Sequence, residues 1–440
     1  MEEIDGYIPR QQEEKVQYWL KQGYITAILG ARQTGKTTLI KKLRSQVKQK
    51  SFYYLLDDAM LRGQIQNDFY YLQKDIETKL HTTIGKIQEE IYVFIDEAQK
   101  APEIFELLKI WHDEIGNRIK IIISGSSSLE IQKKSAESLA GRVQYIYLSP
   151  LTLGELLPFK LQLPTVRVIP DLQKIDLTAI AELYAPYYKN RHETELFFKE
   201  MLVFGFLPAI WKNDKLDKFG HLRSVVNTYL EKDIRSLGLV RELGNFQKLL
   251  SILGIQTGQI INYENLSRQT QINVKTIKAY FAILESTFSL ELLLPDTSPL
   301  DQMVKSPKAY LYDLGIANFL AKRTSIDNVL DSKSSGGIFE SAILNTLLSF
   351  MKNETVPSRV YYWRDYAGHE IDFILRFGEE IIPIEVTLDS GIEKKKWQNL
   401  KYFLEKNQSV KRVFMIYQGA PQEKKIGNTR VFCLPWYLWQ

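Results

Sequence analysis

Short apolar runs alternate with stretches of helical spacing in the first 150 residues of the chain. The runs are rich in β-branched and aromatic residues, which favours buried strands, and they lie at 25–29, 52–56, 91–95 and 119–123. Between the runs, apolar residues recur at helical spacing, as in Leu39, Ile40 and Leu43. Strands that alternate with helices predict parallel βαβ units, so we expect an α/β three-layer sandwich whose ligand lies at the carboxyl edge of the strands.

The pattern then becomes nearly all helical. Over residues 151–240 the helical spacing is broken at Gly205 and Pro208, which predicts a small helical lid after the core. Over residues 241–330 two helices, separated by a turn at 272–274, have the spacing of a winged helix-turn-helix.

Strands return in the last part of the chain. A helix that opens at Phe339 precedes apolar runs, which predicts a further α/β domain with strands at 360–364, 370–375, 381–387 and 413–417. A chain of 440 residues suggests about three domains of ordinary size. The changes of pattern divide it further, into a core, a lid, a winged helix and a tail at 1–150, 151–240, 241–330 and 331–440.

The run at 25–29 leads into a phosphate-binding motif. Gly30, four residues, Gly35, Lys36 and Thr37 have the spacing in which backbone N–H groups cradle phosphates, the lysine reaches the β and γ oxygens and the threonine ligates magnesium. The same pattern arises by chance in unrelated loops, but the flanking strand and helix favour a nucleotide site. We predict ATP and Mg²⁺ as cofactors, with the nucleotide bound by Gly30, Ala31, Arg32, Gln33, Thr34, Gly35, Lys36, Thr37 and Thr38.

Two carboxylates follow the run at 91–95. Asp96 would hold the magnesium together with Thr37, because Mg²⁺ prefers hard oxygen ligands and keeps several waters. Glu97 would orient and deprotonate the attacking water. The alternative is a helix N-cap with a first-turn acid, and the phosphate motif upstream favours the catalytic interpretation.

Two more positions are catalytic candidates beside Lys36 and Glu97. The run at 119–123 ends in Ser124 and further small residues up to Ser128, which would lie beside the γ-phosphate or form only a tight turn. Arg142 precedes a fifth strand within 141–154. It is either a surface residue or an arginine finger that stabilises the transferring phosphoryl group in its own or a neighbouring subunit.

The winged helix-turn-helix makes DNA a candidate partner. Its second helix would project four side chains toward a major groove: Lys275, Thr276, Lys278 and Tyr280. Such modules also serve in packing or protein interaction alone, and two lysines are a thin electrostatic footprint. DNA, a protein partner and a further copy of this chain therefore all stay open.

Three acids in the tail, Glu340, Asp372 and Glu385, are able to bind a divalent metal for phosphodiester hydrolysis. The alternative is that two of them are surface residues alternating with apolar ones. A nuclease of this type would need a lysine two residues after Glu385, where this chain has Thr387. The lysines at 394–396 are candidates to replace it, although a solvated helix face accounts for them better.

Composition and net charge change this interpretation of the chain little. The chain is 45% hydrophobic and 25% charged, and its net charge of +5 does not by itself argue for nucleic acid. One cysteine, Cys433, excludes an internal disulfide and a cysteine-cluster metal site. The acidic start lacks an apolar leader and no run is long enough to span a membrane, so we expect a cytoplasmic protein with no membrane partner.

Over essentially its full length the chain resembles the large prokaryotic AAA-type ATPase family in which a P-loop domain is fused to a C-terminal domain of unknown function. The resemblance rests on Ile8-Pro-Arg10, the motif from Gly30, Phe94-Ile-Asp-Glu-Ala-Gln-Lys100, Ser124-Gly-Ser-Ser-Ser128, Gly141-Arg142, Tyr229-Leu-Glu-Lys-Asp-Ile-Arg235 and Pro307-Lys-Ala-Tyr-Leu-Tyr-Asp-Leu-Gly315. It implies an ATPase core and lid, a winged helix, and a tail similar to the PD-(D/E)XK nuclease fold. The chain departs from the family at Thr387, where lysine is usual, and at Phe204-Gly-Phe-Leu-Pro208, where the family has a Gly-Gly-Phe-Pro turn.

The set from phosphate loop to carboxylates predicts a magnesium-dependent ATPase whose hydrolysis cycle moves the lid and, through it, the C-terminal modules, with DNA as a candidate target. The alternative is a slow nucleotide-gated switch or scaffold that holds a protein partner. A third hypothesis, an active metal-dependent DNA nuclease, is disfavoured by Thr387.

Overall fold

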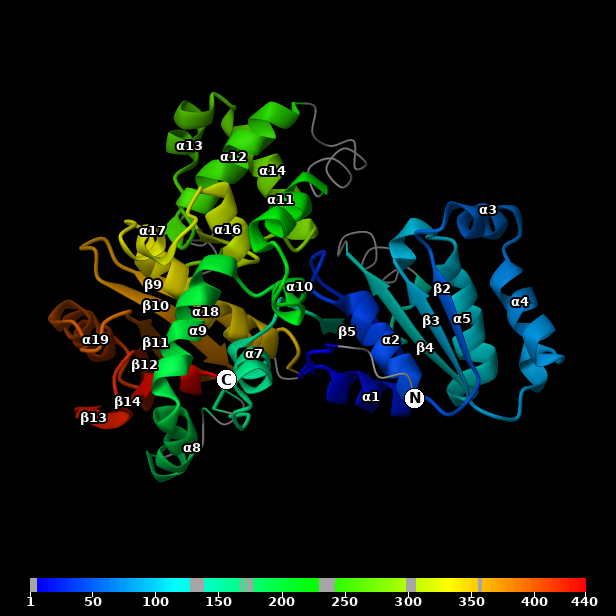
Figure 1. Cartoon of the computed structure of the whole chain (residues 1–440), viewed down its shortest axis with the longest axis horizontal. Helices are drawn as coiled ribbons and strands as arrows, with labels where there is room; N and C mark the ends of the chain where they lie inside the picture. Colours follow the sequence, from blue (N-terminus) through cyan, green and yellow to red (C-terminus); the bar gives the residue numbers. More distant parts are fainter. Residues whose placement is uncertain are drawn as a thin grey trace. The chain divides into compact units, whose positions relative to one another are not determined.

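The computed structural model describes residues 6–126, 138–166, 168–169, 172, 177–228, 242–297, 306–354 and 358–440. Contacts divide the chain into two compact units (Figure 1): residues 1–149 with 286–288, and residues 150–285 with 289–440. We describe each unit separately, and the division into four domains stays a prediction.

The first unit is built on a sheet of five parallel strands, with the order β2-β3-β4-β1-β5. The strands are β1 (Ile25–Leu29), β2 (Ser51–Leu55), β3 (Ile91–Asp96), β4 (Ile119–Gly125) and β5 (Val143–Tyr147). Every residue of β1 and β4 is buried, as expected for central strands of a parallel sheet covered on both faces. The predicted α/β sandwich is therefore confirmed, with all five expected strands present.

Helices cover both faces of this sheet (Figure 1). The helices α1 (Glu13–Lys21) and α2 (Lys36–Gln46) pack on one face through Val16, Leu20 and Leu39. The other face carries α3 (Ala59–Asn67), α4 (Tyr71–Leu80) and α5 (Ile104–Ile115).

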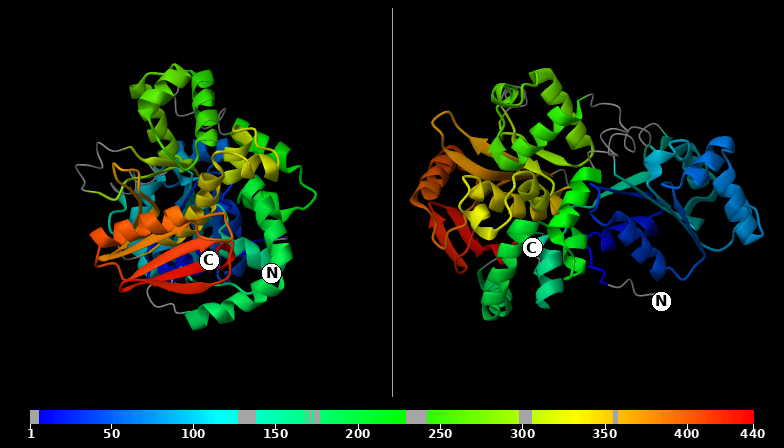
Figure 2. Two further views of the ribbon diagram at one scale, coloured as in Figure 1. Left: turned by 90° about the vertical axis from the view of Figure 1, so that its left-hand side faces the viewer. Right: turned by 45° about the horizontal axis from the view of Figure 1, so that its top comes forward.

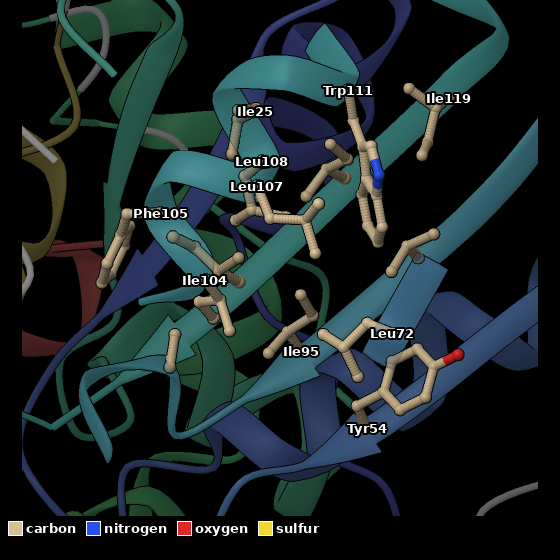
Figure 3. Close-up of a cluster of buried hydrophobic side chains, with 14 of the residues drawn as sticks. Ile25, Tyr54, Leu72, Ile95, Ile104, Phe105, Leu107, Leu108, Trp111 and Ile119 are labelled. Carbon is tan, nitrogen blue, oxygen red and sulfur yellow. The ribbon is translucent and has the colours of Figure 1, made fainter. Parts of the chain in front are cut away.

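The most apolar of these helices is α5, which lies against the sheet (Figure 3). Its Leu107, Leu108 and Trp111 lie among Ile25, Ile95 and Ile119 of three different strands. Trp111 is 1% exposed, and full burial of a large apolar side chain contributes about 1.5–3 kcal/mol. This packing holds the strand ends, and the loops that follow them, in fixed positions.

The second unit contains the helices of the predicted lid: α7 (Leu153–Leu161), α8 (Leu177–Lys189), α9 (Arg191–Phe204), α10 (Pro208–Lys212) and α11 (Lys218–Thr228). They pack against the tail. Phe198 of α9 stacks on Trp436 with ring centroids 3.8 Å apart, and the amide of Asn345 donates to the carbonyl of Leu151 at 2.7 Å. Residues 229–235 of the family resemblance lie in a segment, 229–241, outside the described residues.

A glycine turn joins α9 to α10 at one of the two departures from the family pattern. Gly205 has φ of 73°, and a Cβ there would lie 2.3 Å from the backbone nitrogen of Gly315. Asp313 fixes the turn, because its carboxylate accepts from the backbone N–H of Phe206 at 2.6 Å and of Ile316 at 3.1 Å. A single glycine thus meets the steric demand at this close approach.

The region predicted as a winged helix has the order helix, strand, two helices and two strands. Its elements are α12 (Leu243–Ile255), β6 (Gln259–Ile260), α13 (Tyr263–Thr270), α14 (Val274–Ser286), β7 (Leu290–Leu293) and β8 (Lys308–Leu311), whose strands form an antiparallel sheet in the order β6-β8-β7. The expectation that Tyr280 projects from α14 is wrong. Its side chain is buried, with its ring edge-to-face on Phe246, whereas Lys275 and Lys278 are exposed.

The tail is a six-stranded mixed sheet in the order β13-β14-β12-β11-β10-β9. After α16 (Leu314–Leu320) and α17 (Ile326–Leu330), it comprises α18 (Ser335–Met351), β9 (Ser358–Arg364), β10 (Glu370–Phe377), β11 (Glu380–Val386), α19 (Lys394–Lys406), β12 (Arg412–Tyr417), β13 (Gln422–Ile426) and β14 (Thr429–Pro435). Figure 2 shows α19 lying along this sheet, onto which it packs Leu400, Phe403 and Leu404. Cys433 is buried in β14.

No helix in the described part of the chain is both long enough and apolar enough to cross a membrane.

Candidate functional site

The phosphate motif forms the loop between β1 and α2. Gly30 passes so close to the neighbouring chain that a Cβ there would lie 2.2 Å from the carbonyl oxygen of Leu148. Gly35, with φ of 95°, turns the chain into α2, a left-handed conformation that glycine adopts without strain. The backbone N–H groups at the start of α2 therefore face the end of the loop, where an anion is favoured.

Lys36 is folded over this loop. Its Nζ donates to the carbonyl oxygens of Gly30 at 2.9 Å and Ala31 at 2.7 Å, and the side chain is buried. The Thr34 hydroxyl donates to Ala31 as well, at 2.9 Å. The loop is thus closed around its own lysine, which lies where a phosphate would replace these carbonyls as its partner.

Arg10 holds the loop from outside, and sequence reasoning gave it no role. Its guanidinium donates to the carbonyl of Thr34 at 2.6 Å and to that of Ser149 at 2.7 Å. Glu13 in turn accepts from the backbone N–H of Arg10 at 2.8 Å. The segment Ile8-Pro-Arg10 was part of the family resemblance, which was the available signal.

Asp96 is fully buried at the end of β3, between two hydroxyl donors. The Ser124 hydroxyl donates to Oδ1 and the Tyr53 hydroxyl to Oδ2, the latter at 3.1 Å. Burial, and then the nearby charge of Asp96, raise the pKa of Tyr53, so the phenol stays protonated and remains a donor. Ser124 is close because β4 lies between β3 and β1, where it pairs with Ile28.

Glu97 follows in a left-handed conformation, with φ of 58°, which turns its carboxylate away from the strand direction. Its Oε2 accepts from the amide of Gln99 at 2.5 Å and from the hydroxyl of Ser126 at 3.2 Å, and its N–H donates to Ser124 at 3.3 Å. Both neighbours lie at the carboxyl edge of the sheet. Ser127 and Ser128 lie outside the described residues.

The structure therefore brings the loop from Gly30 to Thr38, Asp96, Glu97 and Ser124 to one edge of the sheet. A threonine hydroxyl and carboxylate oxygens are the donor types that Mg²⁺ takes, so Thr37 and Asp96 suit that ion.

Arg142 lies elsewhere. It precedes β5, and its carbonyl accepts from the N–H of Ile25 at the start of β1, so it is at the amino edge of the parallel strands. Its guanidinium holds both carboxylate oxygens of Asp113, at 2.6 and 2.9 Å, which raises the pKa of Arg142 and lowers that of Asp113. Within one chain it does not join the loop, and a role in a neighbouring subunit stays a prediction.

The three acids of the tail come together with two lysines. Lys396 Nζ lies 2.7 Å from Asp372 Oδ2 and 2.7 Å from Glu385 Oε2. Glu340 accepts from the hydroxyl of Tyr310 at 2.8 Å and pairs with Lys308 at 3.3 Å. We call the five charged residues of this group the tail ion cluster: Lys308, Glu340, Asp372, Glu385 and Lys396.

Burial sets the electrostatics of this cluster. Burial raises the pKa of Glu385 and of Glu340. Burial also works against ionisation of Asp372, but the ammonium groups of Lys396 and Lys308 outweigh it and lower the pKa of this carboxyl.

Two expectations for this region are wrong. None of the three acids is an exposed surface residue, since the side chains of Glu340, Asp372 and Glu385 are 14%, 8% and 1% exposed. The lysines at 394–396 are not all on a solvated face either, because Lys396 points into the cluster while Lys394 and Lys395 are exposed.

The cluster does not fit a divalent metal ion. Oxygens of all three acids that would ligate it already bond a lysine ammonium. Among the described residues, no group of three or more histidine, cysteine or acidic side chains is arranged to hold a metal.

Family comparisons agree with the first unit. Residues 22–157 match the family model described as AAA domain, so this part of the chain is a P-loop domain of the AAA type. Residues 196–327 and 335–439 match two models of domains of unknown function, DUF8612 and DUF4143. The three matches follow one another in the order that the resemblance implied, an AAA domain and then two domains of unknown function.

Curated relatives are themselves uncharacterized. The proteins Rv2008c of Mycobacterium tuberculosis and Mb2031c of Mycobacterium bovis are each 24% identical over 298 residues, which is 67% of this chain and 58% of theirs. The chain thus spans a little over half of their length. The protein MJ1544 of Methanocaldococcus jannaschii is 22% identical over 400 residues, covering 86% of this chain and 78% of its own.

Solved structures give weaker likenesses. A RuvB variant of Thermotoga maritima is 14% identical with a TM-score of 0.28, covering 69% of this chain and 92% of its own. PCH-2 of C. elegans is 12% identical with a TM-score of 0.31, over 63% and 70%. At such scores these proteins assign no role to any residue of this chain.

Proposed function

We propose that this chain binds ATP with Mg²⁺ at the loop from Gly30 to Thr38 and hydrolyses it. One observation carries the proposal: the buried Asp96 and the adjacent Glu97 lie at the same sheet edge as the phosphate loop, with Ser124 on the strand between them.

Each residue has a defined task in this proposal. Lys36, which bonds the carbonyls of Gly30 and Ala31, would exchange them for the β and γ oxygens, and Thr37 and Asp96 would hold the ion. Bound Mg²⁺ would neutralise charge on the phosphates. Glu97 accepts the proton of the attacking water, while Ser126 and Gln99 fix the direction of its carboxylate.

Two variants together should distinguish ATP binding from ATP turnover. Lys36→Ala removes the charge that holds the phosphates, so we expect loss of both. Glu97→Gln keeps the shape but loses the base, so we expect ATP binding to persist while phosphate release falls roughly 10²- to 10⁴-fold. A fluorescent ATP analogue measures binding and a phosphate assay measures release.

Lys41→Ala is the matched control, because Lys41 is an exposed lysine of the same helix α2; it should behave as the wild type. Equal and negligible phosphate release from the wild type and all three variants would refute hydrolysis.

We further propose that hydrolysis moves the residues of the second unit, and that DNA contacts them through the exposed Lys275 and Lys278. The alternative is a slow nucleotide-gated scaffold for a protein partner. Burial of Tyr280 favours that alternative, because it leaves fewer side chains on the face that would meet DNA. A homo-oligomer in which Arg142 reaches the next subunit belongs to either form of the proposal.

A further inference from the structure

We infer that Lys396 is a built-in counter-cation, which takes the place of a divalent metal ion between Asp372 and Glu385, so that the tail is not a metal-dependent nuclease. The inference concerns the second unit and does not depend on ATP hydrolysis.

Geometry places the ammonium where a bridging cation would be. Lys396 Nζ is 2.7 Å from one oxygen of each carboxylate, and the same oxygen of Asp372 also accepts the N–H of Val386 at 2.7 Å. An ion that ligated both oxygens would lie against the ammonium, and two cations repel strongly where little water screens them.

The lysine is held there by its helix. Leu400 and Phe403, four and seven positions further along α19, are buried in the tail core, and side chains at this spacing lie on one face of a helix. Lys396 therefore points at the sheet because α19 is anchored, whereas its neighbour Lys395 is exposed.

Neither β11 nor Thr387, the residue that follows it, carries a positively charged side chain. Thr387 is buried and its hydroxyl faces Asp389, with its oxygen 3.5 Å from Oδ2 and 3.4 Å from the backbone nitrogen of that residue. The hydroxyl is thus used in the turn after β11. The positive charge that the two acids require comes from the helix instead.

The remaining acid is also occupied from within the chain. Glu340 is held by Tyr310 and Lys308, and Lys308 also pairs with Glu370 at 2.6 Å. Two lysines thus serve four buried or half-buried carboxylates. One atom, Glu385 Oε1, is buried with no hydrogen-bond partner, whereas Oε2 of the same carboxylate bonds Lys396.

Mn²⁺ binding to the full chain without nucleotide tests the inference, with free Mn²⁺ followed by electron paramagnetic resonance. We expect the wild type and the exposed-lysine control Lys395→Met to bind none at this cluster. Lys396→Met should gain one site with a Kd at least 10-fold tighter than any wild-type binding, and Lys396→Met/Asp372→Asn should lose it. Mn²⁺ should also raise the Tm of Lys396→Met alone.

Wild-type Mn²⁺ binding that disappears in Glu385→Gln would overturn the inference, as would Mg²⁺- or Mn²⁺-dependent DNA cleavage that disappears in Asp372→Ala. A folded Lys396→Met that gains no site would show that the ammonium does not stand in the metal's place. If Lys396→Met does not fold, the comparison of the wild type with Glu385→Gln decides, since absence of binding in both supports the inference. Loss of ATP hydrolysis in the Lys36 and Glu97 variants bears on neither result.

Discussion

At the residue scale, the side chains of Lys36 and Arg10 hold the nucleotide loop in its shape through hydrogen bonds. Lys36 bonds two carbonyls of the loop, and Arg10 bonds a third, that of Thr34. The motif predicted that Lys36 lies at this loop, with phosphate oxygens as its partners and not these carbonyls. The bond from Arg10 was not predicted, because an arginine some twenty residues before a phosphate motif has no local pattern that links it to the loop.

Arg10→Ala should weaken ATP binding more than it slows turnover. Charge-assisted hydrogen bonds contribute about 1.5–3 kcal/mol, so we expect KM for ATP to rise roughly 10-fold or more with a smaller change in kcat, measured by steady-state phosphate release. Arg10→Lys should recover part of the loss, since an ammonium can serve one carbonyl.

Arg118→Ala is the control for this variant. Arg118 also donates to a backbone carbonyl, that of Ile87 at 2.7 Å, but at the amino edge of the same sheet. An equal rise of KM in both variants would mean that Arg10 only stabilises the unit.

At the scale of elements, the central strands β1, β3 and β4 were predictable because they form apolar runs that are almost wholly buried. The edge strand β13, Gln-Glu-Lys-Lys-Ile, was missed because its side chains are largely polar and carry no such run. The choice of Lys396 among three adjacent lysines depends on the rotation of α19. The spacing of Lys396 to Leu400 and Phe403 predicts that all three side chains lie on the buried face of α19. That prediction requires knowledge of where the helix begins.

The turn held by Asp313 should give the second unit a specific pH dependence. Burial raises the pKa of Asp313 to about 6, against 3.8 for an ordinary aspartate, although three backbone N–H groups oppose the shift. Between these values the native carboxyl keeps a proton that the unfolded chain has released, so stability falls as pH rises from about 4 to about 6. The full effect is about 3 kcal/mol.

Asp313→Asn should remove this slope, as measured by urea unfolding at several pH values. Its amide keeps one carbonyl acceptor, as the protonated carboxyl does, so its stability should be independent of pH over this window. Asp327→Asn, an exposed acid at the start of α17, is the control. A slope unchanged in Asp313→Asn would contradict the assignment.

At the scale of the whole molecule, the open question is what the second unit binds. Lys275 and Lys278 are exposed on α14, and each phosphate contact contributes about 0.9 to the slope of log K against log salt concentration. If DNA is the partner, Lys275→Ala/Lys278→Ala should lower this slope by about 2 in a DNA titration, and should reduce any stimulation of ATP hydrolysis.

Lys248→Ala/Lys322→Ala removes the same charge from two other exposed lysines of the second unit and is the control. Salt-independent or undetectable DNA binding by the wild type would exclude this role and favour the protein-scaffold alternative.

The bond from Arg10 to Ser149 has a mechanical consequence. One guanidinium grips the phosphate loop at Thr34 and, with its other nitrogen, the last residue before the chain leaves the first unit. A shift of the loop at Thr34 would therefore act on Ser149 through one planar guanidinium group. Arg10 thus links the phosphate loop to Ser149, the residue after which the chain continues into the second unit.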